Sequence, residues 1–174
     1  MADAPDTLTL RHHRDLRGRE RDPWTRRILL ALLVALLVVA LFDVFGQRPT
    51  TSRAKSAPVS LEVYAPSRLR GGLFYMARFT IRARQEVKDA VLVLDSGWLE
   101  SMQINTIEPS PIGEASRNGS LVLDYGHVAA GNKLVAFLEF QVNPTNVGHR
   151  AQDVDLYDGT RRIVHVDRSL TIFP

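Results

Sequence analysis

The sequence LFYMARFTIRAR, residues 73–84, decides the fold class of most of this chain. Apolar side chains recur at every second position from Tyr75 to Ala83, and Arg78 and Arg82 lie between them. Successive side chains of a β-strand point to opposite faces of its sheet, so one face of this strand is expected to pack and the other to meet water. The stretch therefore predicts a half-buried antiparallel β-strand.

The same alternation recurs along the chain, with turn residues about every eight to twelve positions, which is typical of an all-β sandwich. Asn118-Gly119 and Asp158-Gly159 tolerate the positive φ that two-residue hairpin loops require. We expect an antiparallel, immunoglobulin-like β-sandwich of about seven to eight strands. The expected strands cover residues 59–64, 73–84, 89–94, 102–107, 120–124, 133–142, 151–157 and 161–172, the last with a break near Asp167.

A second stretch, ILLALLVALLVVALFDVF, occupies residues 28–45. As a helix its eighteen residues would span roughly 27 Å, close to a hydrocarbon core of about 30 Å. In lipid every backbone N–H and C=O must be satisfied within the segment, so a lone apolar stretch crosses as a helix. We therefore expect one transmembrane signal-anchor α-helix over residues 24–46, in contact with the lipid bilayer.

The charges on either side of the apolar stretch predict its orientation. Residues 1–27 hold seven Arg, whereas Arg48, Arg53 and Lys55 follow the stretch. Because cations favour the cytoplasmic side, the N-terminus is expected inside and the C-terminal domain outside. Nineteen Arg against three Lys is typical of a GC-rich bacterial genome, so the expected location is the bacterial plasma membrane.

Composition divides the rest of the chain into three parts. Residues 1–23 carry dense mixed charge and few large apolar side chains, which predicts a disordered cytoplasmic tail. Residues 47–58 are polar and rich in Pro, Ser and Thr, which predicts a linker, and residues 59–174 form the expected extracytoplasmic domain. Cleavage as a signal peptide is an alternative, although the end of the apolar stretch offers no small-residue cleavage site.

The formal net charge of +3 is not concentrated in the C-terminal part, where residues 47–174 hold fifteen Lys or Arg against thirteen acids. Such a balance gives little general attraction for a polyanion, so no nucleic-acid partner is expected. The chain has no cysteine, which excludes disulfides, thiolate metal sites and cysteine nucleophiles.

Asp153, Asp155 and Asp158 suggest a calcium loop, because hard cations prefer several carboxylate oxygens. An EF-hand would require Glu where Val164 stands, so we expect two of these carboxylates to face solvent from a strand and the third to form a turn. A calcium site is therefore not expected at this hairpin.

His127, His149 and His165 lack the spacing of a zinc site and are expected as scattered surface side chains. No Gly-x-Ser-x-Gly motif or similar context marks a nucleophile. We therefore expect no metal ion, no cofactor and no catalytic residue, and the chain is predicted not to be an enzyme.

Ala31 and Ala35 form a small-x-x-x-small pair that would let another helix approach closely. Asp43 is expected at the outer end of the helix, where its carboxylate either reaches water or contacts a partner helix. Two alternatives remain open at this point: the face with Ala31 and Ala35 pairs with a second helix, or the helix only anchors the chain.

Arg78, Arg82 and Arg84 are the most concentrated basic group of the domain. They either bind an anionic wall glycan or lipid headgroups, or form a solvated face paired with acids on an adjacent strand. Val135 and Phe137 alternate with further apolar residues, so their strand is apolar on both faces. Either the fold covers both faces, or Val135 and Phe137 contribute to a protein-binding patch.

Gly-containing turns precede long strands in LRGG (69–72) before FTIRA (79–83), and in YGHVAAGNKL (125–134) before an alternating strand, with VLVL (91–94) between them. This pattern resembles bacterial cell-surface immunoglobulin-like (CARDB-like) repeats. The resemblance implies a sandwich used in adhesion, spacing or assembly, and it carries over no catalytic residue. With the anchor, it predicts an accessory subunit of an envelope complex that binds another membrane or envelope protein. The alternative is binding of anionic cell-wall glycan or lipid headgroups through the basic face.

Overall fold

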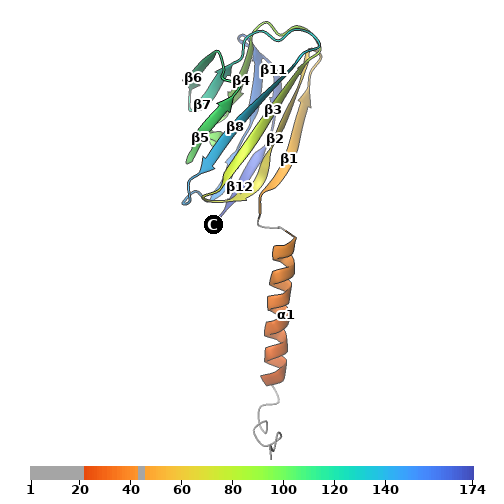
Figure 1. Ribbon diagram of the computed structural model, residues 1–174, viewed down its shortest axis with the longest axis vertical. Coiled ribbons are helices and arrows are strands. Elements are labelled where there is room, and N and C mark those ends of the chain that lie inside the picture. Colours follow the sequence, from red (N-terminus) through yellow and green to blue (C-terminus); the bar gives the residue numbers. More distant parts are fainter. Residues whose placement is uncertain (1–21, 43–45) are drawn as a thin grey trace, which may run out of the picture. The chain divides into compact units, whose positions relative to one another are not determined.

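The structure, a computed structural model, describes residues 22–42 and 46–174, which belong to two separate compact units. In the first unit, α1 (Asp22–Leu41) is the long apolar helix that the sequence predicts, and its described side chains are exposed (Figure 1). By length and composition, Pro23–Leu41 is able to cross a membrane. Its insertion in a bilayer remains a prediction.

The second unit is a sandwich of two β-sheets, which confirms the all-β fold class (Figure 1). Pairing is antiparallel except between β12 and the end of β2, which are parallel. The seven-stranded sheet has the order β5-β8-β3-β2-β12-β9, with β1 also paired to β2, and the five-stranded sheet has the order β11-β10-β4-β7-β6. The larger sheet contains β1 (Arg48–Lys55), β2 (Val59–Arg70), β3 (Phe74–Ala83), β5 (Met102–Glu108), β8 (Lys133–Val142), β9 (Gly148–Ala151) and β12 (Ser169–Phe173). The smaller contains β4 (Ala90–Leu94), β6 (Gly113–Arg117), β7 (Ser120–Asp124), β10 (Val154–Asp158) and β11 (Arg161–Val166).

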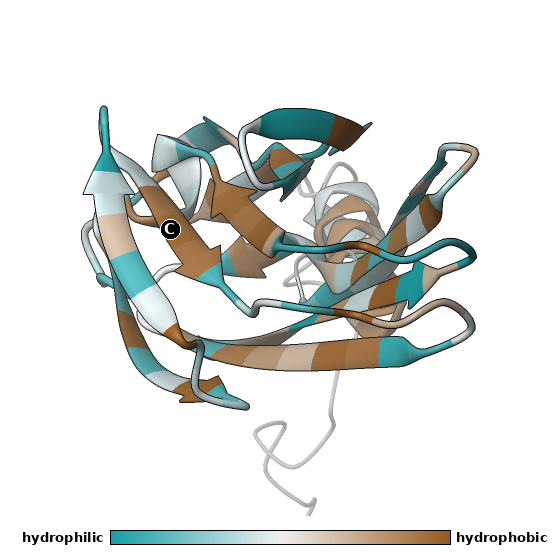
Figure 2. Cartoon of the chain, turned by 90° about the horizontal axis from the view of Figure 1, so that it is seen from above, coloured by the Kyte–Doolittle hydropathy of each residue, from teal (hydrophilic) through white to brown (hydrophobic). Residues whose placement is uncertain are grey.

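The core lies between the sheets and is built from the alternation seen in the sequence. Hydrophobic and hydrophilic residues alternate along several strands in Figure 2. On β3 the apolar set from Tyr75 to Ala83 is buried, as expected. Trp98, on a short 3₁₀ helix (Ser96–Trp98), is fully buried, with ring centroids 5.4 Å from Phe79 and 5.3 Å from Phe140. These aromatic contacts fix the two sheets against each other.

The expected linker over residues 47–58 is wrong for most of its length. β1 pairs antiparallel with β2 from Arg48, opposite Arg68, to Lys55, opposite Ser60. Its side chains alternate between exposed and half-buried, and Ala54 packs against the core. Pro49 fits because it lies beside a register irregularity on an edge strand, where proline is tolerated. The sandwich therefore begins at Arg48 and not at Val59.

Residues 46–174 form twelve strands where seven to eight were expected. β6 and β9 were missed together with β1; every residue of β6 is exposed, so no alternation marks it. The break near Asp167 is confirmed, because β11 and β12 are separate strands in different sheets. The Asn118-Gly119 turn is also confirmed, with φ of 52° and 82°.

Candidate functional site

The outer side of the seven-stranded sheet carries a row of cations. Strand register places Lys55 opposite Ser60, Ser60 opposite Arg82, and Arg82 opposite Lys133, so the row crosses β1, β2, β3 and β8. Among the described residues, Lys55, Arg82 and Lys133 have no ion-pair partner, and Arg84, just after β3, has none either. Four unpaired cations therefore gather at one end of this face.

Beyond the cation row, the same face carries an acidic side chain paired with arginines and then an aromatic ring. Glu62 accepts a hydrogen bond from Arg53 Nε at 2.9 Å and lies 3.9 Å from Arg78 Nη2. Arg78 also lies over the ring of Tyr64, with Cζ 5.0 Å from the centroid. The alternative of cations paired with an acid on the neighbouring strand thus describes Arg78 but not Arg82.

Val135 and Phe137 lie on this same outer side. Register places Phe137 opposite Arg78 and Val135 opposite Thr80, and Phe137 is 38% exposed. Although β8 lies between β5 and β3, no described element covers its outer side. The structure therefore brings together the arginine and the apolar candidates, which the sequence presented as separate groups.

We call this surface the basic face. It consists of two adjoining hollows of about 340 and 420 Å³ that share Glu62, Thr80 and Arg82. Sequence reasoning missed Arg53 and Lys55 as members, because they lie in the expected linker; the alternation of polar and small residues there was the available signal. The charged and apolar members are Arg53, Lys55, Glu62, Arg78, Arg82, Arg84, Lys133, Val135 and Phe137.

The outer side of the five-stranded sheet has the opposite charge, and we call it the acidic face. Two adjoining hollows of about 520 and 250 Å³ share Val93, Ser120 and Asp155. Their floor is apolar, from Val91, Val93, Ala115, Val122 and Tyr157. The charged residues around them are Asp95, Glu114, Asp124, Asp153 and Asp155, with Arg117 and His165.

Further carboxylates concentrate beside the acidic face. Asp158 Oδ1 accepts a hydrogen bond from the backbone N–H of Asp89 at 3.0 Å. Desolvation, together with the charges of Asp124 and Asp158 and a hydrogen bond to Asp124, raises the pKa of Asp89. The sequence singled out Asp158 as a turn residue but not Asp89 or Asp124, because the three come from strand ends far apart in the chain.

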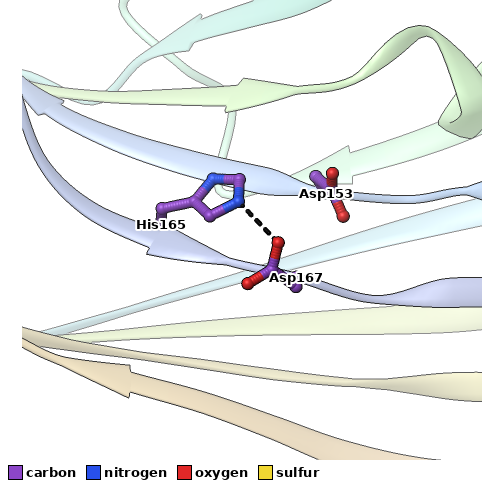
Figure 3. Close-up of side chains that lie close together, drawn as sticks. All are labelled: Asp153, His165 and Asp167. Carbon is purple, nitrogen blue, oxygen red and sulfur yellow. Dashed lines mark hydrogen bonds and ion pairs between the residues drawn. The ribbon is translucent and has the colours of Figure 1, made fainter.

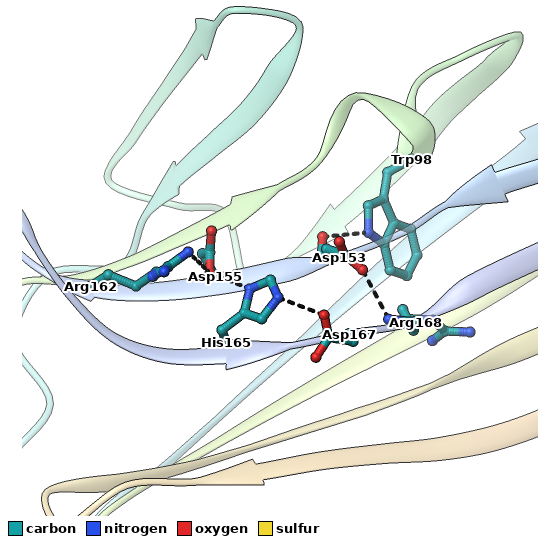
Figure 4. A network of polar contacts seen from close by, with 7 residues as sticks. All are labelled: Trp98, Asp153, Asp155, Arg162, His165, Asp167 and Arg168. Atoms are coloured by element: carbon teal, nitrogen blue, oxygen red, sulfur yellow. Dashed lines mark hydrogen bonds and ion pairs between the residues drawn. The ribbon is translucent and has the colours of Figure 1, made fainter.

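His165 is held between two carboxylates at the edge of the acidic face (Figures 3 and 4). Its Nδ1 lies 2.7 Å from Asp155 Oδ1 and its Nε2 lies 2.9 Å from Asp167 Oδ1. Hydrogen bonds to these carboxylates raise the pKa of His165. The geometry suits an imidazolium that donates from both nitrogens. The sequence did not predict the two acidic partners that hold His165.

Asp153, His165 and Asp167 have ligand atoms within 4.8 Å of one another and are the described residues that could hold a metal ion. Asp153 Oδ1, however, accepts a hydrogen bond from the backbone N–H of Arg168 at 3.0 Å. A protonated His165 has no lone pair for a metal. The arrangement therefore favours an ion-pair network. Of the other histidines that the structure describes, His127 pairs with Glu86 and His149 with Thr171.

The helix candidates remain predictions. Ala31 and Ala35 lie one turn apart on α1 and are exposed among the described residues. Asp43 lies outside the described residues, so its expected place at the outer end of the helix stays an expectation.

No family model matches this chain, and no curated protein matches it. One similar solved structure is the third cohesin of ScaC in complex with the ScaB dockerin from Acetivibrio cellulolyticus, with 12% identity and a TM-score of 0.42 over 60% of this chain and 92% of that chain. Another is the solution structure of CaCohA2 from Clostridium acetobutylicum, with 14% identity and a TM-score of 0.42 over 59% of this chain and 83% of that chain. At these scores neither similarity indicates what this chain binds. The resemblance to bacterial cell-surface immunoglobulin-like repeats stays a prediction.

Proposed function

We propose that this chain is a single-pass membrane protein with a cytoplasmic N-terminus, whose extracytoplasmic sandwich is a non-enzymatic interaction module of an envelope complex. The basic face is its binding surface, and the partner is an acidic surface on a protein of that complex. The observation that carries this is the position of unpaired Arg82 and Lys133 beside half-buried Val135 and exposed Phe137. An apolar centre with a charged rim is the usual anatomy of a protein interface.

A second candidate is binding of an anionic cell-wall glycan, which the unpaired cations alone would favour. Lipid headgroups are the weaker version of this candidate. The chain enters the domain at Arg48, whereas Lys55 and the cation row lie at the other end of β1, about 23 Å away at about 3.3 Å per strand residue. The cations thus lie at the end of the sheet away from the chain's point of attachment.

The test uses a photoreactive benzoylphenylalanine in place of Phe137 in the full chain, irradiated in membranes. We expect a discrete protein adduct that disappears in the Arg82→Glu, Lys133→Glu variant, because charge reversal repels an acidic partner. Val147 supplies the matched control position, since it is an apolar loop residue that is 47% exposed.

Equal adducts from positions 137 and 147, or none from either, would refute the protein-binding proposal. The glycan candidate predicts a different result. In that case purified wall polymer binds the full chain, binding is lost when Arg78, Arg82 and Arg84 all become Glu, and Phe137→Ser has little effect.

A further inference from the structure

We propose that the partner of the basic face is the acidic face of a second copy of this chain, so that copies associate side by side in a row. This rests on the proposed function, because it takes the basic face to be a protein-binding surface and names the protein. The acidic surface that the basic face would bind is then present on every copy of this chain.

The charges of the two faces are complementary. The basic face contains the cations Arg53, Lys55, Arg78, Arg82, Arg84 and Lys133 and the single carboxylate Glu62. The acidic face contains the carboxylates Asp95, Glu114, Asp124, Asp153 and Asp155. Its cations are Arg117, Arg162, whose Nη1 lies 3.4 Å from Asp155 Oδ1, and, when protonated, His165, so carboxylates remain in excess. Opposite potentials on two surfaces steer association and fix its register.

The apolar centres also correspond. Val135 and Phe137 stand beside the cations of one face, and Val91, Val93 and Val122 form the floor between the carboxylates of the other. Joining the faces would bury both apolar centres within rims of opposite charge, which is the arrangement of a specific interface. No described helix or loop covers either face.

The same charges decide the symmetry of the contact. Two basic faces or two acidic faces would repel each other, so a two-fold symmetric pair through either face is disfavoured. The faces are the outer sides of opposite sheets (Figure 1), so a copy that binds through one face leaves the other open. A contact of this heterologous kind extends into a row unless its rotation closes a ring. Copies stacked with parallel strands all present Arg48 at the same end, as anchored chains require.

The absence of cysteine allows a direct test by disulfide crosslinking of the full chain in membranes. Val93→Cys and Val135→Cys place one thiol at the centre of each face. We expect the double variant to form a ladder of dimers, trimers and larger species on oxidation. An equal mixture of the two single variants should stop at dimers, and each single variant alone should remain monomeric.

Charge variants make the test specific. Arg82→Glu with Lys133→Glu should abolish the ladder, whereas Arg48→Glu with Arg68→Glu, an equal charge change at the other end of the same sheet, should leave it intact. About 1 M salt should also weaken the ladder by screening. Crosslinking of single variants alone, or a ladder insensitive to Arg82→Glu with Lys133→Glu, would overturn the proposal. If no ladder forms while Phe137 still gives an adduct with a different protein, the second copy is wrong and the proposed function stands; if both are absent, both fail.

Discussion

The guanidinium of Arg168 lies over the ring of Trp98, with Cζ 5.2 Å from the ring centroid. Arg168 belongs to the short connection between β11 and β12, where the chain passes from the smaller sheet to the larger one. Its Nη2 donates to the carbonyl oxygens of Ala65 at 3.2 Å and Pro66 at 2.8 Å. Desolvation lowers the pKa of Arg168 to about 10. The buried Arg168 side chain therefore links the segment between β11 and β12 to Trp98 and to β2. Figure 4 shows Arg168 beside Trp98.

Replacing Arg168 by Ala should lower the free energy of unfolding by about 2–4 kcal/mol, because it removes the donor that the carbonyls of Ala65 and Pro66 share and empties the space over Trp98. Urea unfolding of the full chain in detergent, followed by Trp98 fluorescence in a Trp24→Phe background, measures the change. Arg161→Ala, at an exposed position on β11, is the matched control and should stay within about 0.5 kcal/mol of the parent. Equal effects of the two substitutions would contradict the structural role of Arg168.

Gly97 is required by a close approach of two backbone segments. A Cβ at this position would overlap the carbonyl oxygen of Ala151 and lie 2.9 Å from its carbonyl carbon. Gly97→Ala should therefore lower the free energy of unfolding by about 2 kcal/mol or more, since backbone cannot move aside as a flexible side chain would. Gly113→Ala is the control, because its Cβ would make only ordinary contacts with the Asp124 side chain, at 3.7 Å from Cβ and 3.9 Å from Oδ2. Urea unfolding followed by Trp98 fluorescence compares the two variants. Equal urea midpoints would show that the backbone around position 97 moves to accept a Cβ at little cost.

The ion pairs of His165 predict a dependence of stability on pH. The imidazole has an ordinary pKa of 6.5, and hydrogen bonds to Asp155 and Asp167 raise it in the folded chain. A raised pKa contributes stability that is fully present below pH 6.5 and is lost as pH rises through the folded pKa. The parent should therefore exceed His165→Gln in urea midpoint by more at about pH 5.5 than at about pH 8.5.

A double-mutant comparison isolates this pH effect. In a background with Asp155→Asn and Asp167→Asn, the difference between His165 and Gln should no longer grow toward low pH. If the stability difference between His165 and Gln kept the same pH dependence in this background, the pH effect would come from other groups.

The pairing of β1 with β2 predicts a resistance to proteolysis that a linker would lack. Arg53 is a trypsin site whose side chain is 61% exposed, yet its backbone is paired with β2 opposite Glu62. Cleavage after Arg53 should therefore be slow in the native chain, because the strand must first detach. Ala54→Asp places a charge against the core and should speed this cleavage about tenfold, as a loss of about 1.4 kcal/mol of local stability would. Mass spectrometry of timed digests identifies the cut, and rapid native cleavage would restore the linker interpretation.

The alternation in residues 73–84 was sufficient to predict a two-layer β fold, because side chains on one face of a strand must share one environment. It was insufficient for strands without a buried face, so β6 escaped prediction. β1 escaped because its half-buried positions hold small residues such as Ser52 and Ala54, which read as linker composition. Local composition therefore identified the core strands and failed at the edges.

The sequence by itself determined the apolar helix, the sandwich class and part of the basic face, namely Arg78, Arg82, Arg84, Val135 and Phe137. These follow from periodicity and composition, which are local properties of the chain. Tertiary structure decided that Arg78 stands opposite Phe137 and that Lys55, Arg82 and Lys133 fall in one row, because strand register is set by pairing between distant segments. It also decided the acidic face, whose carboxylates are gathered from three strands and from two connections. Charge complementarity between opposite sheets is a property of that arrangement and has no counterpart in the linear order of residues.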